Sequence, residues 1–217
     1  MLGESQLREL LAPFGVELTD HQAAQLMAYL DLLLRWNKRI NLTAIRTAQQ
    51  CVTRHFGESL YLSRFTRLEG RLLDIGSGAG FPGLALKIPF PELSATLLEP
   101  VAKKRAFLKE VARACGMDAV EVRAERLGEF VRQAPTASFD SATSRAVGHL
   151  EELVPLATRC LKLGGRLFLW LSREQGEGLR ERLGARQGKE GGGVQWDSPM
   201  PIPLSRQGEI WCGQRKR

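Results

Sequence analysis

The sequence has few of the features that mark secreted, membrane-bound or metal-stapled proteins. Its cysteines, Cys51, Cys115, Cys160 and Cys212, lie far apart and form no C-x-x-C pair. That spacing indicates neither a disulfide framework nor a zinc cluster. No apolar run approaches the ~20 residues of a membrane span, and the first residues lack the basic-then-apolar pattern of a signal peptide. We therefore expect a soluble protein of the reduced cytoplasm, without a metal.

Length and charge narrow the class further. A chain of 217 residues suits one α/β domain of about 150 residues and a smaller appended part. Lys and Arg outnumber Asp and Glu by 31 to 24, which gives a net charge of +7. This balance favours a polyanionic partner such as a nucleic acid.

The first part of the chain reads as helices. Apolar residues recur at spacings of three and four up to Gly15, which should end the first helix. Thr19 followed by Gln22, and Thr47 followed by Gln50, have the form of capping boxes that begin two more helices. We predict a helical region over residues 1–66 that faces RNA, followed by a second domain over residues 67–217.

From residue 67 on, short apolar runs alternate with helical patterns, which predicts a parallel sheet covered by helices on both faces. The charged, glycine-containing stretch over 172–193 matches no motif, and part of it is expected to be mobile. The tail suggests two closing strands around a Pro-rich loop. The five expected parallel strands lie at residues 72–75, 94–98, 119–122, 139–143 and 166–171.

The stretch from Arg71 to Gly83, R-L-L-D-I-G-S-G-A-G-F-P-G, is the centre of the second domain. A buried strand breaks into glycines, and Gly76, Gly78 and Gly80 can take positive φ and let a ligand approach the main chain. Pro82 suits the start of the helix that follows. The pattern predicts a binding loop made of backbone groups.

Two classes of cofactor fit this loop. Read from Gly78, G-A-G-F-P-G matches G-x-G-x-x-G, the dinucleotide fingerprint, with Glu99 about twenty residues on. Read from Asp74, D-x-G-x-G-x-G-F is the spelling of methyltransferases that use S-adenosylmethionine. A carboxylate at Asp74 can face an amino group or a sulfonium but would repel a pyrophosphate, so the methyltransferase interpretation is favoured.

Other candidate binding residues follow strands. Glu99 can accept both hydroxyls of a ribose. Ala124 and Glu125 follow the third strand, where the turn borders an adenine in nucleoside-binding folds. Arg145, at the end of the fourth strand, can hold a carboxylate or a phosphate, or it can form an ordinary salt bridge.

Basic side chains in the helical region and on the helix after Glu99 are candidates for contacts with RNA. His55 could be catalytic, contact RNA, or be a structural histidine paired with Glu58 at i+3. The cationic face of the helix after Glu99 is equally typical of an ordinary solvated face. The RNA-binding candidates are Lys38, Arg39, Arg46, Arg54, Lys103 and Lys104.

Together these motifs resemble the bacterial 16S rRNA guanine-N7 methyltransferase family (RsmG, first named glucose-inhibited division protein B). One departure is Glu58, where that family usually has Asp. The segments that carry the resemblance are W-N-K-R-I-N-L-T, R-H-F-G-E-S-L, L-L-D-I-G-S-G-A-G-F-P-G, L-L-E-P-V-A-K-K-R-A-F-L, R-A-E-R and S-R-A-V.

The resemblance implies a class I methyltransferase fold, Rossmann-like, with a mostly parallel seven-stranded sheet, an antiparallel last strand and an N-terminal helical extension. It implies S-adenosylmethionine as cofactor and a guanine in 16S rRNA of the small ribosomal subunit, or of an assembly intermediate, as substrate. We expect a monomer. The cofactor contacts it implies, together with those argued above, are Asp74, Gly76, Gly78, Phe81, Glu99, Ala124, Glu125 and Arg145.

No catalytic dyad is apparent, and none is needed, because the N7 atom of guanine carries a lone pair and no proton. Alternatives remain open from the residues alone. A methyltransferase for a small molecule or a protein would turn over without RNA, and a nicotinamide-dependent oxidoreductase would bind NAD. A non-enzymatic RNA-binding protein would transfer no methyl group.

Overall fold

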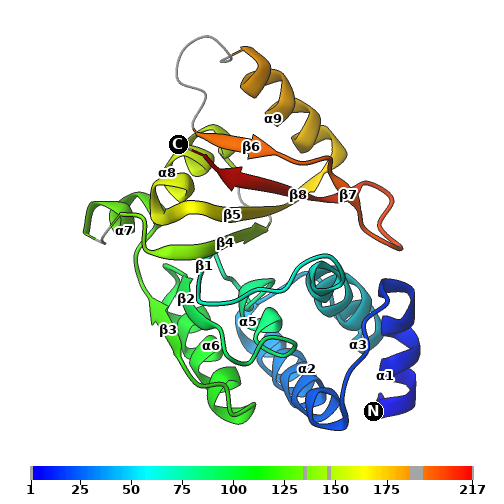
Figure 1. Cartoon of the computed structure of the whole chain (residues 1–217). Helices are drawn as coiled ribbons and strands as arrows, with labels where there is room; N and C mark the ends of the chain where they lie inside the picture. Colours follow the sequence, from blue (N-terminus) through cyan, green and yellow to red (C-terminus); the bar gives the residue numbers. More distant parts are fainter. Residues whose placement is uncertain (1, 134–135, 146–147, 186–192, 217) are drawn as a thin grey trace.

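The computed structural model describes residues 2–133, 136–145, 148–185 and 193–216. Its N-terminal part is helical, as predicted, and packs beneath an α/β sheet (Figure 1). The helices of this part are α1 (Glu4–Leu11), η1 (Ala12–Phe14), α2 (Asp20–Ile40), α3 (Ala48–Cys51), η2 (Val52–Gly57), α4 (Glu58–Leu60) and η3 (Tyr61–Arg64).

The end of η1 and the start of α2 have the predicted chemistry, whereas at the start of α3 only half of the predicted capping box is present, the Thr47 hydroxyl accepting from the Gln50 amide. Gly15 ends η1 with φ 60°, a left-handed conformation that favours glycine. At the start of α2, the Thr19 hydroxyl accepts from the Gln22 amide N–H, and the Gln22 side chain accepts from the Thr19 amide, so the capping box is complete. The helix then runs to Ile40 and ends at Asn41 in a left-handed conformation. The segment η2 is a π-helix, a form that often marks functional sites.

The sheet is mostly parallel with an antiparallel last strand, as predicted, but it has eight strands within the described residues rather than the seven expected. Its order is β3-β2-β1-β4-β5-β8-β6, and a two-residue strand, β7, also pairs with β8. The first five strands are parallel, while β8 runs antiparallel to β5. The strands are β1 (Arg71–Ile75), β2 (Ser94–Leu98), β3 (Val120–Arg123), β4 (Phe139–Arg145), β5 (Leu161–Ser172), β6 (Val194–Trp196), β7 (Met200–Pro201) and β8 (Gly208–Arg215).

Helices cover both faces of the sheet. One hydrophobic cluster joins the N-terminal helices to β2, α5 and α6, and a second joins the opposite face of the sheet to α7, α8 and α9. Because Leu26 of α2 and Phe107 of α6 belong to the same buried cluster, the N-terminal helices form part of the covering layer. The remaining helices are α5 (Gly83–Leu86), α6 (Ala102–Ala114), α7 (Leu127–Gln133), α8 (Leu150–Cys160) and α9 (Arg173–Ala185).

Two local expectations were wrong: the fourth and fifth strands, β4 and β5, are both longer than predicted. The helix after the glycine-rich turn is a single turn, α5. The stretch over 172–193 includes a helix, α9, whose Gly176 lies against the indole of Trp211. Residues 186–192 of that stretch lie outside the described ranges, and its expected mobility stays a prediction.

Candidate functional site

The glycine loop, residues 76–83, connects β1 to α5 and is fixed by main-chain hydrogen bonds. Gly76, Gly78 and Gly80 have φ of 72°, 55° and 89°, which confirms that the turn needs glycine at these positions. The amides of Gly76 and Ser77 both donate to the carbonyl of Leu98, at 3.0 Å. The loop is thereby held against the end of β2.

Asp74 lies beneath the glycine loop and is fully buried. Its Oδ1 accepts a hydrogen bond of 2.7 Å from the Thr143 hydroxyl on β4. A Cβ built on Gly83 would lie 2.4 Å from the Cβ of Asp74, so the loop can close over the carboxyl only with glycine there. Burial raises the pKa of Asp74 to about 6, against the effect of its hydrogen bonds. These contacts do not test whether Asp74 also contacts the cofactor, so that contact stays a prediction.

Glu99 connects the glycine loop to the turn after β2. Its Oε2 accepts from the Gly78 amide at 2.9 Å, and its Oε1 accepts from the Val101 amide at 2.8 Å. A carboxylate has about four lone-pair positions, so two remain for further donors. The predicted ribose contact is compatible with these bonds and stays a prediction.

A cleft of about 480 Å³ opens at the carboxyl ends of β1, β2 and β3. We refer to it as the strand-end cleft. It lies beside the point where the strand order reverses between β1 and β4, the usual ligand position in open α/β sheets. Its lining includes Ile75, Gly76, Leu98, Pro100, Glu125 and His149.

Two of the predicted cofactor residues, Gly76 and Glu125, thus line the strand-end cleft. Arg123 donates to the Glu125 carboxylate and holds its pKa low, at about 2, so this group is ionised at neutral pH. Ala124, next to it, is exposed. The other predicted cofactor residues are not among the described residues that line this cleft, namely Asp74, Gly78, Phe81, Glu99, Ala124 and Arg145.

Phe81 lies inside a stack of aromatic rings rather than at the cleft. Its ring is parallel to Tyr29 at 5.4 Å and to His55 at 4.8 Å, between centroids. The Tyr29 hydroxyl donates to the Ala79 carbonyl at 2.5 Å. The N-terminal helices therefore contact the glycine loop directly. Sequence reasoning missed Tyr29, whose only signal was a tyrosine on the apolar face of α2.

His55 contacts Thr43 rather than the expected Glu58. Its Nε2 lies 2.8 Å from the Thr43 hydroxyl oxygen. Burial, with the nearby Arg145 and Arg54, lowers its pKa to about 3. His55 is therefore neutral at physiological pH.

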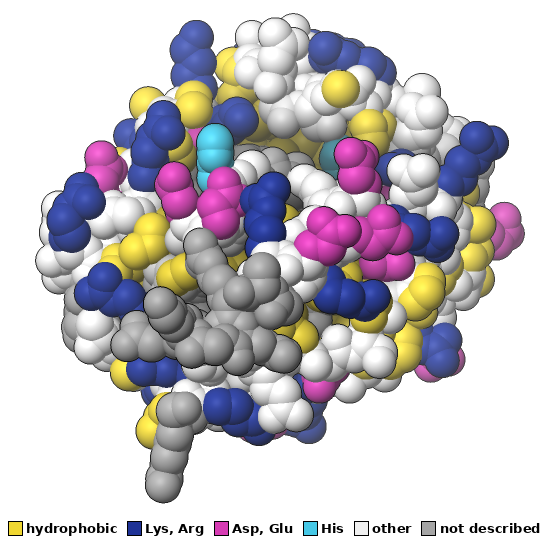
Figure 2. All heavy atoms as spheres, turned by 90° about the horizontal axis from the view of Figure 1, so that it is seen from above, with side chains coloured by type: hydrophobic (Ala, Val, Ile, Leu, Met, Phe, Trp, Pro, Cys, Tyr) yellow, Lys and Arg dark blue, Asp and Glu magenta, His cyan; other side chains and the backbone are white. Residues whose placement is uncertain are grey.

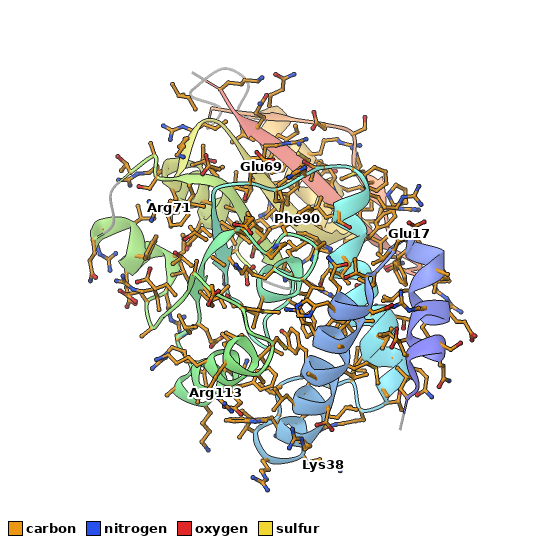
Figure 3. The ribbon with its side chains drawn as sticks, turned by 60° about the horizontal axis from the view of Figure 1, so that its bottom comes forward. Glu17, Lys38, Glu69, Arg71, Phe90 and Arg113 are labelled. Atoms are coloured by element: carbon orange, nitrogen blue, oxygen red, sulfur yellow. The ribbon has the colours of Figure 1, made fainter. Side chains whose placement is uncertain are left out.

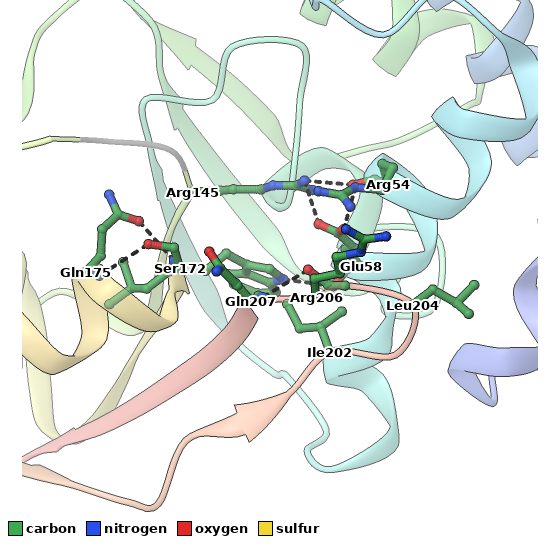
Figure 4. A pocket seen from close by; sticks show the side chains of 13 residues that line it. Arg54, Glu58, Arg145, Ser172, Gln175, Ile202, Leu204, Arg206 and Gln207 are labelled. Carbon is green, nitrogen blue, oxygen red and sulfur yellow. Dashed lines mark hydrogen bonds and ion pairs between the residues drawn. The ribbon is translucent and has the colours of Figure 1, made fainter.

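Arg145 takes part in a second constellation, with Glu58 and Arg54 (Figure 4). Its Nη2 donates to Glu58 Oε2 and to the Arg54 carbonyl, both at 2.7 Å. Burial raises the pKa of Glu58, and the two arginines partly oppose this. These residues line a pocket of about 590 Å³ at the ends of β4 and β5, which we refer to as the edge pocket. The structure thus shows the salt bridge that was the alternative for Arg145, and its cofactor contact stays a prediction.

The RNA-binding candidates lie on the surface of the N-terminal helices and α6. Lys38 points away from the body of the protein at the end of α2 (Figure 3), and with Arg39 it lines a hollow of about 410 Å³. Arg46 donates to the Asn37 carbonyl at 3.2 Å. Lys103 is exposed and Lys104 half-buried in the first turn of α6.

The opposite side of the molecule has a different charge pattern. Acidic and basic side chains are interleaved on the face seen in Figure 2. Between α9 and α8, Arg182 forms an ion pair with Glu151. Such a mixed surface has no strong field of one sign. Within the described ranges, no helix is long and apolar enough to cross a membrane.

Comparisons with known proteins agree with this geometry. Residues 22–186 match the family GidB, described as rRNA small subunit methyltransferase G. The chain is 43% identical over 167 residues to a ribosomal RNA small subunit methyltransferase G of Chloroflexus aggregans, covering 76% of this chain and 70% of that protein. It is 35% identical over 207 residues to the protein of the same name from Alkaliphilus metalliredigens, covering 92% and 84%.

A solved structure supports the fold. The ribosomal protein L11 methylase of Lactobacillus delbrueckii subsp. bulgaricus aligns with a TM-score of 0.60 at 15% identity, over 76% of this chain and 80% of that one. At this identity the likeness concerns the fold alone. The family match and the identity to the curated relatives carry the assignment: this chain belongs to the rRNA small subunit methyltransferase G (GidB) family.

Proposed function

We propose that this protein transfers a methyl group from S-adenosylmethionine to the N7 atom of a guanine in 16S rRNA of the small ribosomal subunit. The observation that carries the proposal is the strand-end cleft, which joins a glycine loop in the family's pattern to an acidic turn at the switch point of the sheet. The substrate named for the family's members and the basic candidates on the N-terminal helices support an RNA acceptor.

The residues of the cleft fit this cofactor. Gly76 leaves its main chain uncovered, as a close approach by a nucleoside requires. Glu125 supplies an ionised carboxylate, and Leu98 and Pro100 supply apolar walls of the kind that cover an adenine. Glu99 does not line the cleft but lies at the end of β2 beside it; already bonded to two amides, it retains acceptor positions for ribose hydroxyls. The negative charges of Glu99 and Glu125 favour a cationic ligand over a pyrophosphate.

When bound, S-adenosylmethionine supplies a methyl group on a sulfonium: the bond from this carbon to N7 forms as its bond to sulfur breaks, the electron pair stays on sulfur, and guanine takes the positive charge. The acceptor nitrogen has no proton to lose, so no residue here need act as a general base. The protein's part is to hold both partners in line, which can lower a barrier by roughly 7–11 kcal/mol.

The acceptor must be accessible in a loop or unstacked from its neighbours. We propose that Lys38, Arg39, Arg46, Arg54, Lys103 and Lys104 contact the phosphates around it, that residues 1–66 form the RNA-facing part, and that the protein works in the cytoplasm as a monomer.

The test uses tritiated S-adenosylmethionine and small subunits that lack the modification. The proposal expects one labelled nucleotide per subunit, identified as N7-methylguanine by digestion and mapping. Transfer of label to a protein or a small molecule, with none to the RNA, would refute it.

A further inference from the structure

The edge pocket extends the line of strand ends that begins at the strand-end cleft. Arg145 ends β4 and pairs in register with Trp170 of β5, so the pocket lies two strands along from Gly76. A hollow of about 350 Å³ lies between the two: His149 lines both the cleft and this hollow, and Gln175 lines both the hollow and the edge pocket. A cofactor in the cleft and an acceptor in the pocket would thus share one edge of the sheet.

The floor of the edge pocket is a charged pair that is almost closed to water. The Glu58 side chain is 7% exposed and that of Arg145 is 17% exposed. The Trp170 indole N–H donates to the Glu58 carbonyl at 2.8 Å and holds α4 against β5 (Figure 4). The pair is therefore fixed by the fold.

This pair leaves one acceptor and one donor without a hydrogen bond among the described residues. Glu58 Oε2 and Arg145 Nη2 bond to each other, whereas Glu58 Oε1 and Arg145 Nη1 are buried and make no hydrogen bond within the described ranges. Buried polar atoms of native proteins are nearly always hydrogen-bonded, so both atoms can take a further hydrogen bond from a ligand. The nearest cation, Arg54 Nε, lies 2.9 Å from Oε1 but outside hydrogen-bond geometry.

We propose that the edge pocket receives the target guanine, with Glu58 Oε1 accepting from its N1–H and N2–H edge and Arg145 Nη1 donating to O6. This inference rests on the proposed function, identifies the residues that orient the base, and assigns Arg145 to the base in place of the predicted cofactor contact, since Arg145 lines the edge pocket and not the strand-end cleft. The pocket's volume, about 590 Å³, is within the usual range for small-molecule sites.

The arrangement selects guanine over adenine. Guanine presents an acceptor, O6, beside the donors N1–H and N2–H, which matches a donor beside a carboxylate. At the same positions adenine presents a donor, its N6 amino group, and an acceptor, N1. The N6 amino group would face the Arg145 donor, and N1 would face the Glu58 carboxylate, so neither hydrogen bond could form. Sites built to hydrogen-bond one pattern strongly reject its reverse.

When no base is bound, the Arg54 guanidinium covers the Glu58 carboxylate. It offers the carboxylate the same kind of N–H groups as the N1 and N2 edge of guanine, and the Arg54 side chain is 49% exposed. It can therefore leave Glu58 when the base enters. The carboxylate then lies against a ring that becomes positively charged during methylation, which stabilises the transition state.

The experiment measures single-turnover methylation of small subunits that carry either guanine or inosine at the target position. Inosine lacks the N2 amino group and keeps N7. Because a hydrogen bond to a charged group contributes about 1.5–3 kcal/mol, the wild-type protein should methylate inosine about 10- to 100-fold more slowly. In Glu58→Gln the guanine rate should fall and the preference for guanine over inosine should shrink about tenfold or more.

Glu110→Gln is the matched control, since Glu110 lies on the outer face of α6 and bonds to Arg113 alone among the described residues. It should keep the wild-type preference. Calorimetry with S-adenosylhomocysteine should give the same affinity for Glu58→Gln as for the wild type, because Glu58 does not line the strand-end cleft.

The inference is overturned if the wild-type protein methylates guanine and inosine equally well, a result that needs no variant to fold. It is also overturned if Glu58→Gln slows both substrates by the same factor, as a purely structural role would require. If the wild-type protein labels neither RNA, the proposed function itself fails.

Discussion

Tyr29 contacts the glycine loop in two ways, through its hydroxyl group and through the packing of its ring, and one substitution can distinguish their effects. The Tyr29 hydroxyl is fully buried and donates to the Ala79 carbonyl at 2.5 Å. Burial raises its pKa well above the usual value, so it remains a neutral donor at every physiological pH. A Cβ built on Gly80 would lie only 2.1 Å from the Tyr29 hydroxyl oxygen. The conformation of the loop therefore depends on its contact with the N-terminal helices.

Replacing Tyr29 with Phe keeps the ring stack on Phe81 and removes only the hydroxyl. The buried carbonyl then lacks its partner, which costs about 1–3 kcal/mol of unfolding free energy. For a chain of this length each kcal/mol lowers Tm by roughly 2–4 °C. If about half of this loss falls on the loop's ordered state, the affinity for S-adenosylhomocysteine should fall roughly 2- to 12-fold.

Urea unfolding and isothermal titration calorimetry measure the two effects. Tyr61→Phe is the matched control: Tyr61 stacks edge-on against Phe65, and its hydroxyl makes no hydrogen bond to a described residue. The control should leave stability and affinity near wild type. If Tyr29→Phe and Tyr61→Phe behave alike in both assays, the hydroxyl does not support the loop.

Three further outcomes follow from the geometry. Gly83→Ala should destabilise the fold by about 1–3 kcal/mol in urea unfolding, because the added methyl would lie 2.4 Å from the Asp74 side chain; unchanged stability would show that the loop can move away. His55 has a folded pKa of about 3, below its unfolded value of 6.5, so its contribution is complete above pH 6.5 and is lost as pH falls toward 3. The stability advantage of the wild type over His55→Gln should therefore shrink by about 1.4 kcal/mol per pH unit between pH 6 and 4, and a constant difference would contradict the neutral buried ring. Replacing Lys38 and Arg39 with Ala should weaken binding to 16S rRNA and reduce the slope of log K against log salt by about 1 for each phosphate that these side chains neutralise; an unchanged slope would place the RNA elsewhere.

Local chemistry explains which features the sequence could predict. The glycine loop was predictable because positive φ at alternate positions requires glycine, and the order of sheet and helices followed from hydrophobic periodicity. The start of α2 was equally clear, since the capping box is contained in four residues. These features depend on neighbours along the chain.

The missed features depend on residues far apart in sequence. Arg145 and Glu58 are 87 positions apart, and only the pairing of β4 with β5 under α4 brings them together. No motif in the stretch over 172–193 indicated α9, in which Gly176 allows the helix to approach the ring of Trp211. His55 was expected to bond to Glu58, but the π-helical turn of η2 accompanies a contact with Thr43 instead.

The central claim is that the glycine loop and the strand-end cleft bind a sulfonium nucleoside. Calorimetric titration of the purified protein with S-adenosylmethionine, S-adenosylhomocysteine and NAD tests it most directly. The account predicts saturable heat with one site per chain for the first two ligands and none for NAD. Heat with NAD and none with either nucleoside would contradict it.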